Sequence, residues 1–99
     1  MSENTFQTRV KNYIEMNGGY ALNIPGGTQI PKGTPDLIVC WRGRFLGLEL
    51  KTKTGRLAEL QAEKIANIRD AGGYARRLGE NEWETFKQNL RDMRPYDTV

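Results

Sequence analysis

The sequence has 99 residues, of which 37% are hydrophobic and 27% are charged, a composition typical of one ordinary globular domain. It contains no histidine, which excludes histidine-based acid–base catalysis, catalytic triads and most zinc sites. Lysine and arginine number 15 against 12 aspartates and glutamates, and this net charge of +3 suits a polyanionic partner.

The apolar and glycine patterns predict an α/β domain whose elements follow the order helix, strand, strand, strand, helix, strand, helix. In chain order these are a helix over 5–17, strands over 20–24, 36–41 and 45–51, a helix over 57–71, a strand over 74–78 and a helix over 80–93.

The first half of the chain ends in a long loop. Phe6, Val10 and Ile14 lie at helical spacing, and a glycine pair at 18–19 ends this first helix. After a short strand, residues 25–35 hold three glycines and three prolines, which predicts a loop. This loop leads the chain to Asp36.

The second half predicts a mixed sheet. Two apolar runs flank Arg42-Gly43-Arg44, which is a hairpin signal. The last strand follows a helix and therefore needs a crossover connection, which makes it parallel to its neighbour. Four apolar residues are expected to face the sheet from the intervening helix. They are Leu57, Leu60, Ile65 and Ile68.

The hairpin brings polar side chains together. A two-residue turn at Arg42-Gly43 makes paired positions sum to 85 and sets Asp36 opposite Glu49. A three-residue turn would shift the register by one residue and leave the two carboxylates diagonal but still close. Glu49 and Lys51 share one face of their strand, with Cα atoms about 6.6 Å apart. One small patch therefore holds two acids and one amine.

Such a patch indicates a cation site with hydrolytic chemistry. Adjacent carboxylates beside apolar strands need a counter-charge, and oxygen ligands favour Mg²⁺ or Mn²⁺. Asp36, Glu49 and the backbone carbonyl of Leu50 are the expected ligands, and Lys51 can orient or deprotonate an attacking water. Glu-x-Lys and Pro-Asp are each common as surface features. Their combination on two apolar strands predicts a phosphodiester-cleaving site.

The sequence resembles the PD-(D/E)xK nucleases and, within them, the VRR-NUC domain that occurs as a stand-alone phage protein. The matching segments, in the order of the family, are Gly33-x-Pro35-Asp36, Gly43, Glu49-x-Lys51, Gly55, Leu57-x-x-x-Gln61 and Gly72. The resemblance covers most of the chain. It implies one nuclease domain over residues 1–99, with a restriction-endonuclease-like αβββαβ core, a mixed central sheet flanked by helices, and an added C-terminal helix.

The resemblance also implies a function. Members cut DNA with Mg²⁺ or Mn²⁺, and several resemble Holliday-junction resolvases in forming homodimers, so a branched or flapped DNA substrate and a homodimer are expected. Asp36, Glu49, Lys51 and Gln61 would form the catalytic set, with Asp36 and Glu49 as metal ligands. The family often adds an acidic residue from the first helix. Glu3 fits that pattern, and Glu15 remains the alternative.

Basic residues around this patch are candidate contacts to DNA. They are Lys32, Lys53, Arg56, Arg76 and Arg77, together with Arg42 and Arg44 in the hairpin. The sequence has no recognition helix or zinc finger, so recognition of DNA backbone or shape is expected. Two alternatives stay open: a non-catalytic DNA-binding module with the nuclease fold, and an interaction protein whose charges form a surface network.

Cellular location is also suggested by the sequence. The N-terminal residues lack a basic or apolar signal region, and the longest apolar runs of about five residues are too short to span a membrane. The single cysteine, Cys40, lies in an apolar run and is expected to be a buried thiol. We expect a cytoplasmic protein without a membrane partner. The resemblance to stand-alone phage proteins further implies a phage-encoded protein that acts in the host cell.

Overall fold

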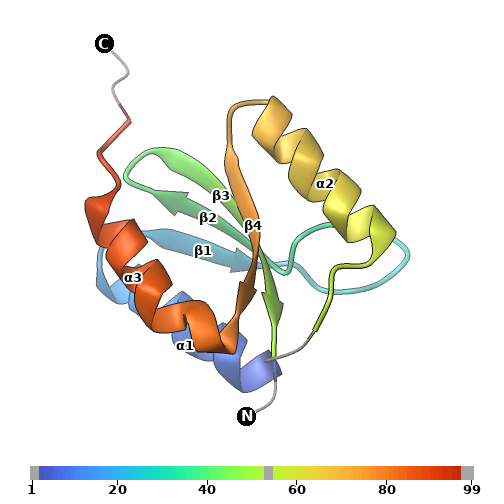
Figure 1. The fold of residues 1–99 in the computed structure, drawn as a ribbon, viewed down its shortest axis with the longest axis horizontal. Helices are drawn as coiled ribbons and strands as arrows, with labels where there is room; N and C mark the ends of the chain where they lie inside the picture. The colour runs from blue at the N-terminus through green and yellow to red at the C-terminus, as the bar shows by residue number, and fades with distance from the viewer. Residues whose placement is uncertain (1–2, 53–54, 97–99) are drawn as a thin grey trace.

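The computed structural model describes residues 3–52 and 55–96 (Figure 1). Over these residues the chain forms α1 (Glu3–Met16), β1 (Tyr20–Asn23), β2 (Leu37–Trp41), β3 (Arg44–Lys51), α2 (Glu59–Asp70), β4 (Tyr74–Gly79), the 3₁₀ turn η1 (Glu80–Glu82) and α3 (Trp83–Asp92). The predicted α/β class and the predicted order of elements are confirmed.

The four strands form one mixed sheet in the order β1-β2-β3-β4. β1 pairs antiparallel with β2, and β2 pairs antiparallel with β3. β3 and β4 are parallel, because α2 carries the chain back across the sheet between them. The mixed sheet expected from the strand-helix-strand segment is therefore confirmed.

The β2–β3 hairpin has the predicted two-residue turn. Trp41 pairs with Arg44 and Leu37 pairs with Leu48, so paired positions sum to 85. Arg42 and Gly43 both have positive φ, at 52° and 78°, as a type I′ turn requires. This turn sets which side chains of β2 and β3 face each side of the sheet.

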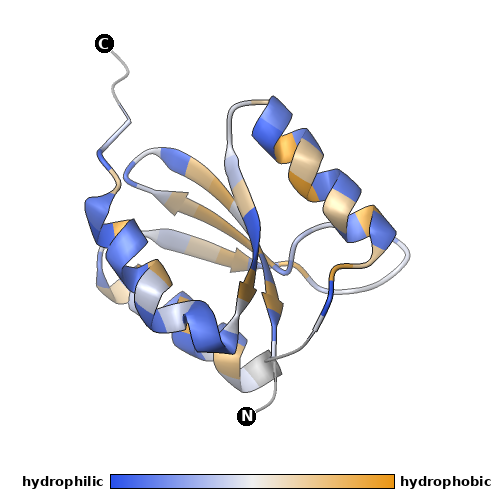
Figure 2. Cartoon of the chain, in the orientation of Figure 1, coloured by the Kyte–Doolittle hydropathy of each residue, from blue (hydrophilic) through white to orange (hydrophobic). Residues whose placement is uncertain are grey.

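One face of the sheet carries the main hydrophobic core. α1 and α3 lie together against this face, while α2 lies on the opposite side (Figure 1). Apolar residues run along the strands, and polar residues cover the outer surfaces of the helices (Figure 2). The core is built by Phe6, Val10 and Ile14 of α1, Leu46, Leu48 and Leu50 of β3, and Trp83, Phe86 and Leu90 of α3. Alternate residues of β3 therefore face α2.

The layer under α2 is thinner and depends on a glycine. A Cβ atom at Gly47 would lie 2.9 Å from Cδ1 of Ile68 and 3.2 Å from Cγ of Pro35. Ile65 is buried here, but Leu60 is 44% exposed. The prediction for Leu60 is wrong because α2 begins only at Glu59, and its first turn directs the next residue, Gln61, toward the sheet.

The prediction that Cys40 is buried is also wrong. Cys40 is exposed, and its antiparallel partner Tyr20 is 63% exposed. α2 packs mainly on β3 and β4 and leaves Tyr20, Leu22 and Cys40 exposed on the same face of β1 and β2, so an apolar run in sequence does not bury every second residue there.

The hairpin also anchors the end of α3. Nε1 of the buried Trp41 donates a hydrogen bond to the Leu90 carbonyl at 2.8 Å. The guanidinium of Arg42 donates to the Arg91 carbonyl at 3.0 Å, and that of Arg44 donates to the Arg94 carbonyl at 2.7 Å. The first two bonds are to carbonyls in the last turn of α3, where a helix lacks its own donors, and the third holds the segment that follows the helix. Both hairpin arginines are thus engaged in the fold.

Among the residues described, no helix is long and apolar enough to cross a membrane.

Replacing Trp41 with phenylalanine should lower the free energy of unfolding by about 2 to 3 kcal/mol, because the Leu90 carbonyl keeps only the longer bond from the Met93 N–H at 3.3 Å and the smaller ring leaves a void. Urea unfolding followed by circular dichroism measures the change. Tyr20→Phe, at an exposed position, is the control and should change it by less than about 0.5 kcal/mol. An unchanged unfolding midpoint for Trp41→Phe would contradict this account.

Candidate active site

Asp36 stands directly before β2 and is held from three sides. The Leu50 N–H donates a hydrogen bond to Oδ2 of Asp36 at 2.9 Å. The Asp36 carbonyl accepts hydrogen bonds from the Ile24 N–H at 2.8 Å and from Nε2 of Gln7 at 3.2 Å. Asp36 is therefore held in place by contacts with β3, with the end of β1 and with α1. The paired positions of the hairpin, continued by one residue, put it opposite Glu49.

Glu49 is a buried carboxylate on the sheet face that α2 covers. Its residue surface is only 3% exposed. Oε2 accepts a hydrogen bond from Nε2 of Gln61 at 2.9 Å and lies 3.4 Å from Nζ of Lys51. Oε1 is buried and has no hydrogen-bond partner among the described residues. A buried carboxylate oxygen without a partner is costly for a protein, so a proton or a further ligand on Oε1 would stabilise the site.

The electrostatics of the site follow from this burial. Burial raises the pKa of the Glu49 carboxyl to about 7, the nearby Asp36 carboxyl adds to the rise, and the Lys51 ammonium opposes it. The carboxyl therefore holds a proton more readily than an exposed glutamate does. A second positive charge beside the two carboxylates would favour the ionised form.

Gln61 joins the start of α2 to this cluster. Its Oε1 accepts a hydrogen bond from the Ala58 N–H at 2.8 Å, which caps the helix, while its Nε2 donates to Glu49. The loop before β2 packs against the same helical turn. Gly33 has a φ of +88°, and a Cβ atom there would lie 2.4 Å from the Leu60 carbonyl oxygen. Only glycine fits at this contact. Gly33 therefore allows the loop before β2 to approach the turn of α2 that carries Gln61.

The oxygen donors fit a hard divalent cation. In a β-strand the N–H and C=O of one residue point to the same side, so the Leu50 carbonyl faces the side on which its N–H meets Asp36. Asp36, Glu49 and the Leu50 carbonyl would hold Mg²⁺ or Mn²⁺, with water completing the coordination. Within residues 3–52 and 55–96, no three acidic, histidine or cysteine side chains form one cluster.

α1 approaches the site through its first half. Gln7 contacts the Asp36 carbonyl, a contact that the sequence analysis did not predict. Glu3 begins α1, one helical turn before Gln7, and its side chain lies outside the described residues. Glu15 is exposed and stands two turns past Gln7, about 12 Å along the helix. Of the two alternatives, Glu3 is the nearer to Gln7 along the helix.

The predicted DNA contacts have different surroundings. Lys32 and Asp36 line one cavity of about 660 Å³ in the loop before β2, and Arg56 is exposed. Lys53 lies outside the described residues. Arg76 and Arg77 both pair with Glu82, at 2.9 and 3.1 Å, so their charges are partly balanced within the fold.

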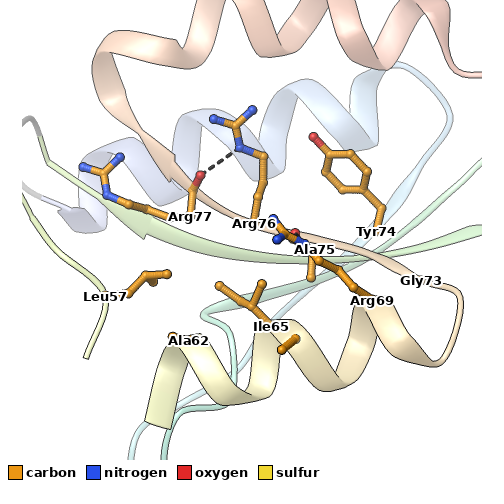
Figure 3. Close-up of a pocket in the computed structure, with 10 residues that line it drawn as sticks. Leu57, Ala62, Ile65, Arg69, Gly73, Tyr74, Ala75, Arg76 and Arg77 are labelled. Atoms are coloured by element: carbon orange, nitrogen blue, oxygen red, sulfur yellow. Dashed lines mark hydrogen bonds between the residues drawn. The ribbon is translucent and has the colours of Figure 1, made fainter. Parts of the chain in front are cut away.

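β4 is an edge strand, and arginines cover its outer carbonyls. Nε of Arg69 donates to the Ala75 carbonyl at 2.7 Å, and Nε of Arg76 donates to the Arg77 carbonyl at 2.8 Å (Figure 3). These bonds occupy acceptors that an added strand would need, which limits edge-to-edge pairing at β4.

Comparisons with protein-family models, with curated proteins and with solved structures find no match for this chain.

Glu49→Gln should make the stability of the metal-free protein less dependent on pH. A carboxyl whose pKa is raised on folding contributes stability below its unfolded pKa of 4.5, and this contribution is lost as the pH rises through about 7. At pH 8 in EDTA the variant should be more stable than the parent by about 2 to 3 kcal/mol, and at pH 4 the two should agree.

Thermal unfolding across this pH range measures the difference. Glu63→Gln, at an exposed position of α2, is the matched control and should follow the parent at every pH. If the parent and Glu49→Gln lost stability in parallel above pH 5, the raised pKa of Glu49 would be refuted.

Proposed function

We propose that this protein is a Mg²⁺- or Mn²⁺-dependent endonuclease that hydrolyses DNA phosphodiester bonds, with a VRR-NUC-like domain of the PD-(D/E)xK type. The observation that supports it best is the cluster of Asp36, Glu49 and Lys51, in which a buried oxygen of Glu49 has no hydrogen-bond partner within residues 3–52 and 55–96. The mixed sheet with α1 and α2 on opposite faces is compatible with the restriction-endonuclease-like core that this proposal requires.

Each residue of the cluster has a role in the proposed reaction. A bound divalent cation would polarise a phosphoryl oxygen and lower the pKa of the attacking water. Asp36 and Glu49 hold that cation, and Gln61 keeps the Glu49 carboxylate oriented through its hydrogen bond to Oε2. Lys51 lies at the edge of the cluster, where its ammonium orients the attacking water and stabilises negative charge on the phosphate.

The proposed substrate is branched or flapped DNA, similar to a Holliday junction. The net charge of +3 favours a polyanion. The cavity that Lys32 and Asp36 line would accept the DNA backbone beside the scissile bond. A homodimer would present two active sites to two strands of one junction. The resemblance to stand-alone phage VRR-NUC proteins is the basis for proposing a phage-encoded enzyme that acts in the host cytoplasm.

Two substitutions separate the proposed roles. Lys51→Met should lower kcat for cleavage roughly 100-fold or more, as expected on losing a group that stabilises the transition state, and should leave Mn²⁺ affinity nearly unchanged. Asp36→Asn should weaken both Mn²⁺ binding and cleavage. Calorimetric Mn²⁺ titration and cleavage of duplex, flap and four-way-junction DNA make the two measurements.

Lys87→Met is the matched control, because Lys87 pairs with Glu84 on α3, across the sheet from Glu49. It should cut DNA at the rate of the parent. The proposal is abandoned if no DNA substrate is cut in Mg²⁺ or Mn²⁺, or if Lys51→Met cuts as fast as the parent. Salt-sensitive DNA binding without cleavage or metal dependence would instead support the non-catalytic alternative.

A further inference from the structure

The stem of Lys51 is packed against Gly55. A Cβ atom added to Gly55 would lie 3.0 Å from both Cβ and Cδ of Lys51 and 3.3 Å from its Cγ. The Gly55 N–H donates a hydrogen bond to the Thr52 carbonyl at 3.1 Å, so Gly55 lies next to the end of β3. The methylene groups of the lysine are thereby covered, and the Lys51 side chain is only 15% exposed.

Arg77 holds Gly55 in this position. Nε of Arg77 donates a hydrogen bond to the Gly55 carbonyl at 2.6 Å. Arg77 is the partner of Glu49 in the parallel register of β3 and β4, so its side chain leaves the sheet on the same face as Glu49 and Lys51. Figure 3 shows the Arg77 side chain extended toward the segment that leads to Leu57.

The Arg77 guanidinium is also held by Glu82. Its Nη1 donates to Oε1 of Glu82 at 3.1 Å, and the same oxygen accepts the Gly79 N–H at 2.7 Å. The guanidinium therefore bridges a fixed carboxylate in η1 and the carbonyl of Gly55. Arg76 shares Glu82 as a partner, but its side chain lies over the Phe86 ring on the other face of the sheet.

We propose that Arg77 is a positioning residue for Lys51, acting through Gly55. By holding the Gly55 carbonyl, Arg77 keeps Gly55 seated on the lysine stem, and this contact directs the ammonium toward the Glu49 carboxylate. The inference rests on the proposed nuclease function only in giving Lys51 its chemical task. The chain of contacts from Glu82 through Arg77 and Gly55 to Lys51 can be tested without any cleavage assay.

The first test follows Lys51 directly by NMR in metal-free protein containing ¹³C-labelled lysine, with the signal assigned by its loss in Lys51→Met. A fixed lysine side chain gives two separate ε-proton signals, and a freely rotating one gives a single signal. The parent should show two signals for Lys51. Arg77→Ala and Gly55→Ala should each merge them, while Arg76→Ala, which removes the same charge and the same Glu82 partner, should leave them separate.

The second test separates positioning from DNA contact by steady-state cleavage kinetics. Arg77→Ala should lower kcat about 10- to 100-fold, the effect expected when a catalytic group is displaced by about 1 Å, with KM for DNA changed less than about threefold. The double variant Arg77→Ala/Gly55→Ala should be no slower than the slower single variant, because both changes break one linkage. Circular dichroism establishes that each variant is folded.

Separate Lys51 signals in both folded variants would overturn the proposal, as would an increase in KM with kcat preserved, which would make Arg77 a simple DNA contact. If the parent cuts no DNA, the nuclease function fails, yet the NMR comparison still decides whether Arg77 and Gly55 position Lys51.

Discussion

The structure depends on one unfavourable placement, the burial of the Glu49 carboxylate between the sheet and α2. A charged carboxylate in such a place requires partners. Gln61 reaches it from the first turn of α2, and Lys51 reaches it from the end of β3. Even so, one oxygen has no partner in the part of the chain that the structure describes, and the pKa of the group is raised to about 7. A fold selected for stability alone would place an apolar residue here, so the site indicates a function.

Glycines allow the surrounding segments to close on this group. Gly47 lets α2 pack close to the sheet, and Gly33 lets the loop before β2 pack against the first turn of α2. Gly55 lets the segment after β3 pack against Lys51. In each case a Cβ atom would meet its neighbour at 3.0 Å or less. Close packing of the backbone thus replaces a large hydrophobic layer on this face, while the main core under α1 and α3 provides most of the apolar burial.

The hairpin shows why much of the site could be predicted. The side-chain period of a strand is two, and a type I′ turn at Arg42-Gly43 leaves a single register, so Asp36, Glu49 and Lys51 follow from local rules. Cys40 and Leu60 were predicted wrongly because their exposure depends on where α2 lies across the sheet. Local periodicity reports which residues share a face, and it does not report how much of that face is covered.

The amino-acid sequence alone determined the order of the elements and the placing of Glu49 and Lys51 on one face of their strand, since both follow from local periodicity. The turn length, and with it the register that sets Asp36 opposite Glu49, was decided by the structure. Only the tertiary structure decided that Gln7 meets Asp36, that Gln61 meets Glu49 and that Arg77 holds Gly55. These contacts join residues separated by 29, 12 and 22 positions. They exist because the layers pack at particular angles and distances, which no local pattern encodes.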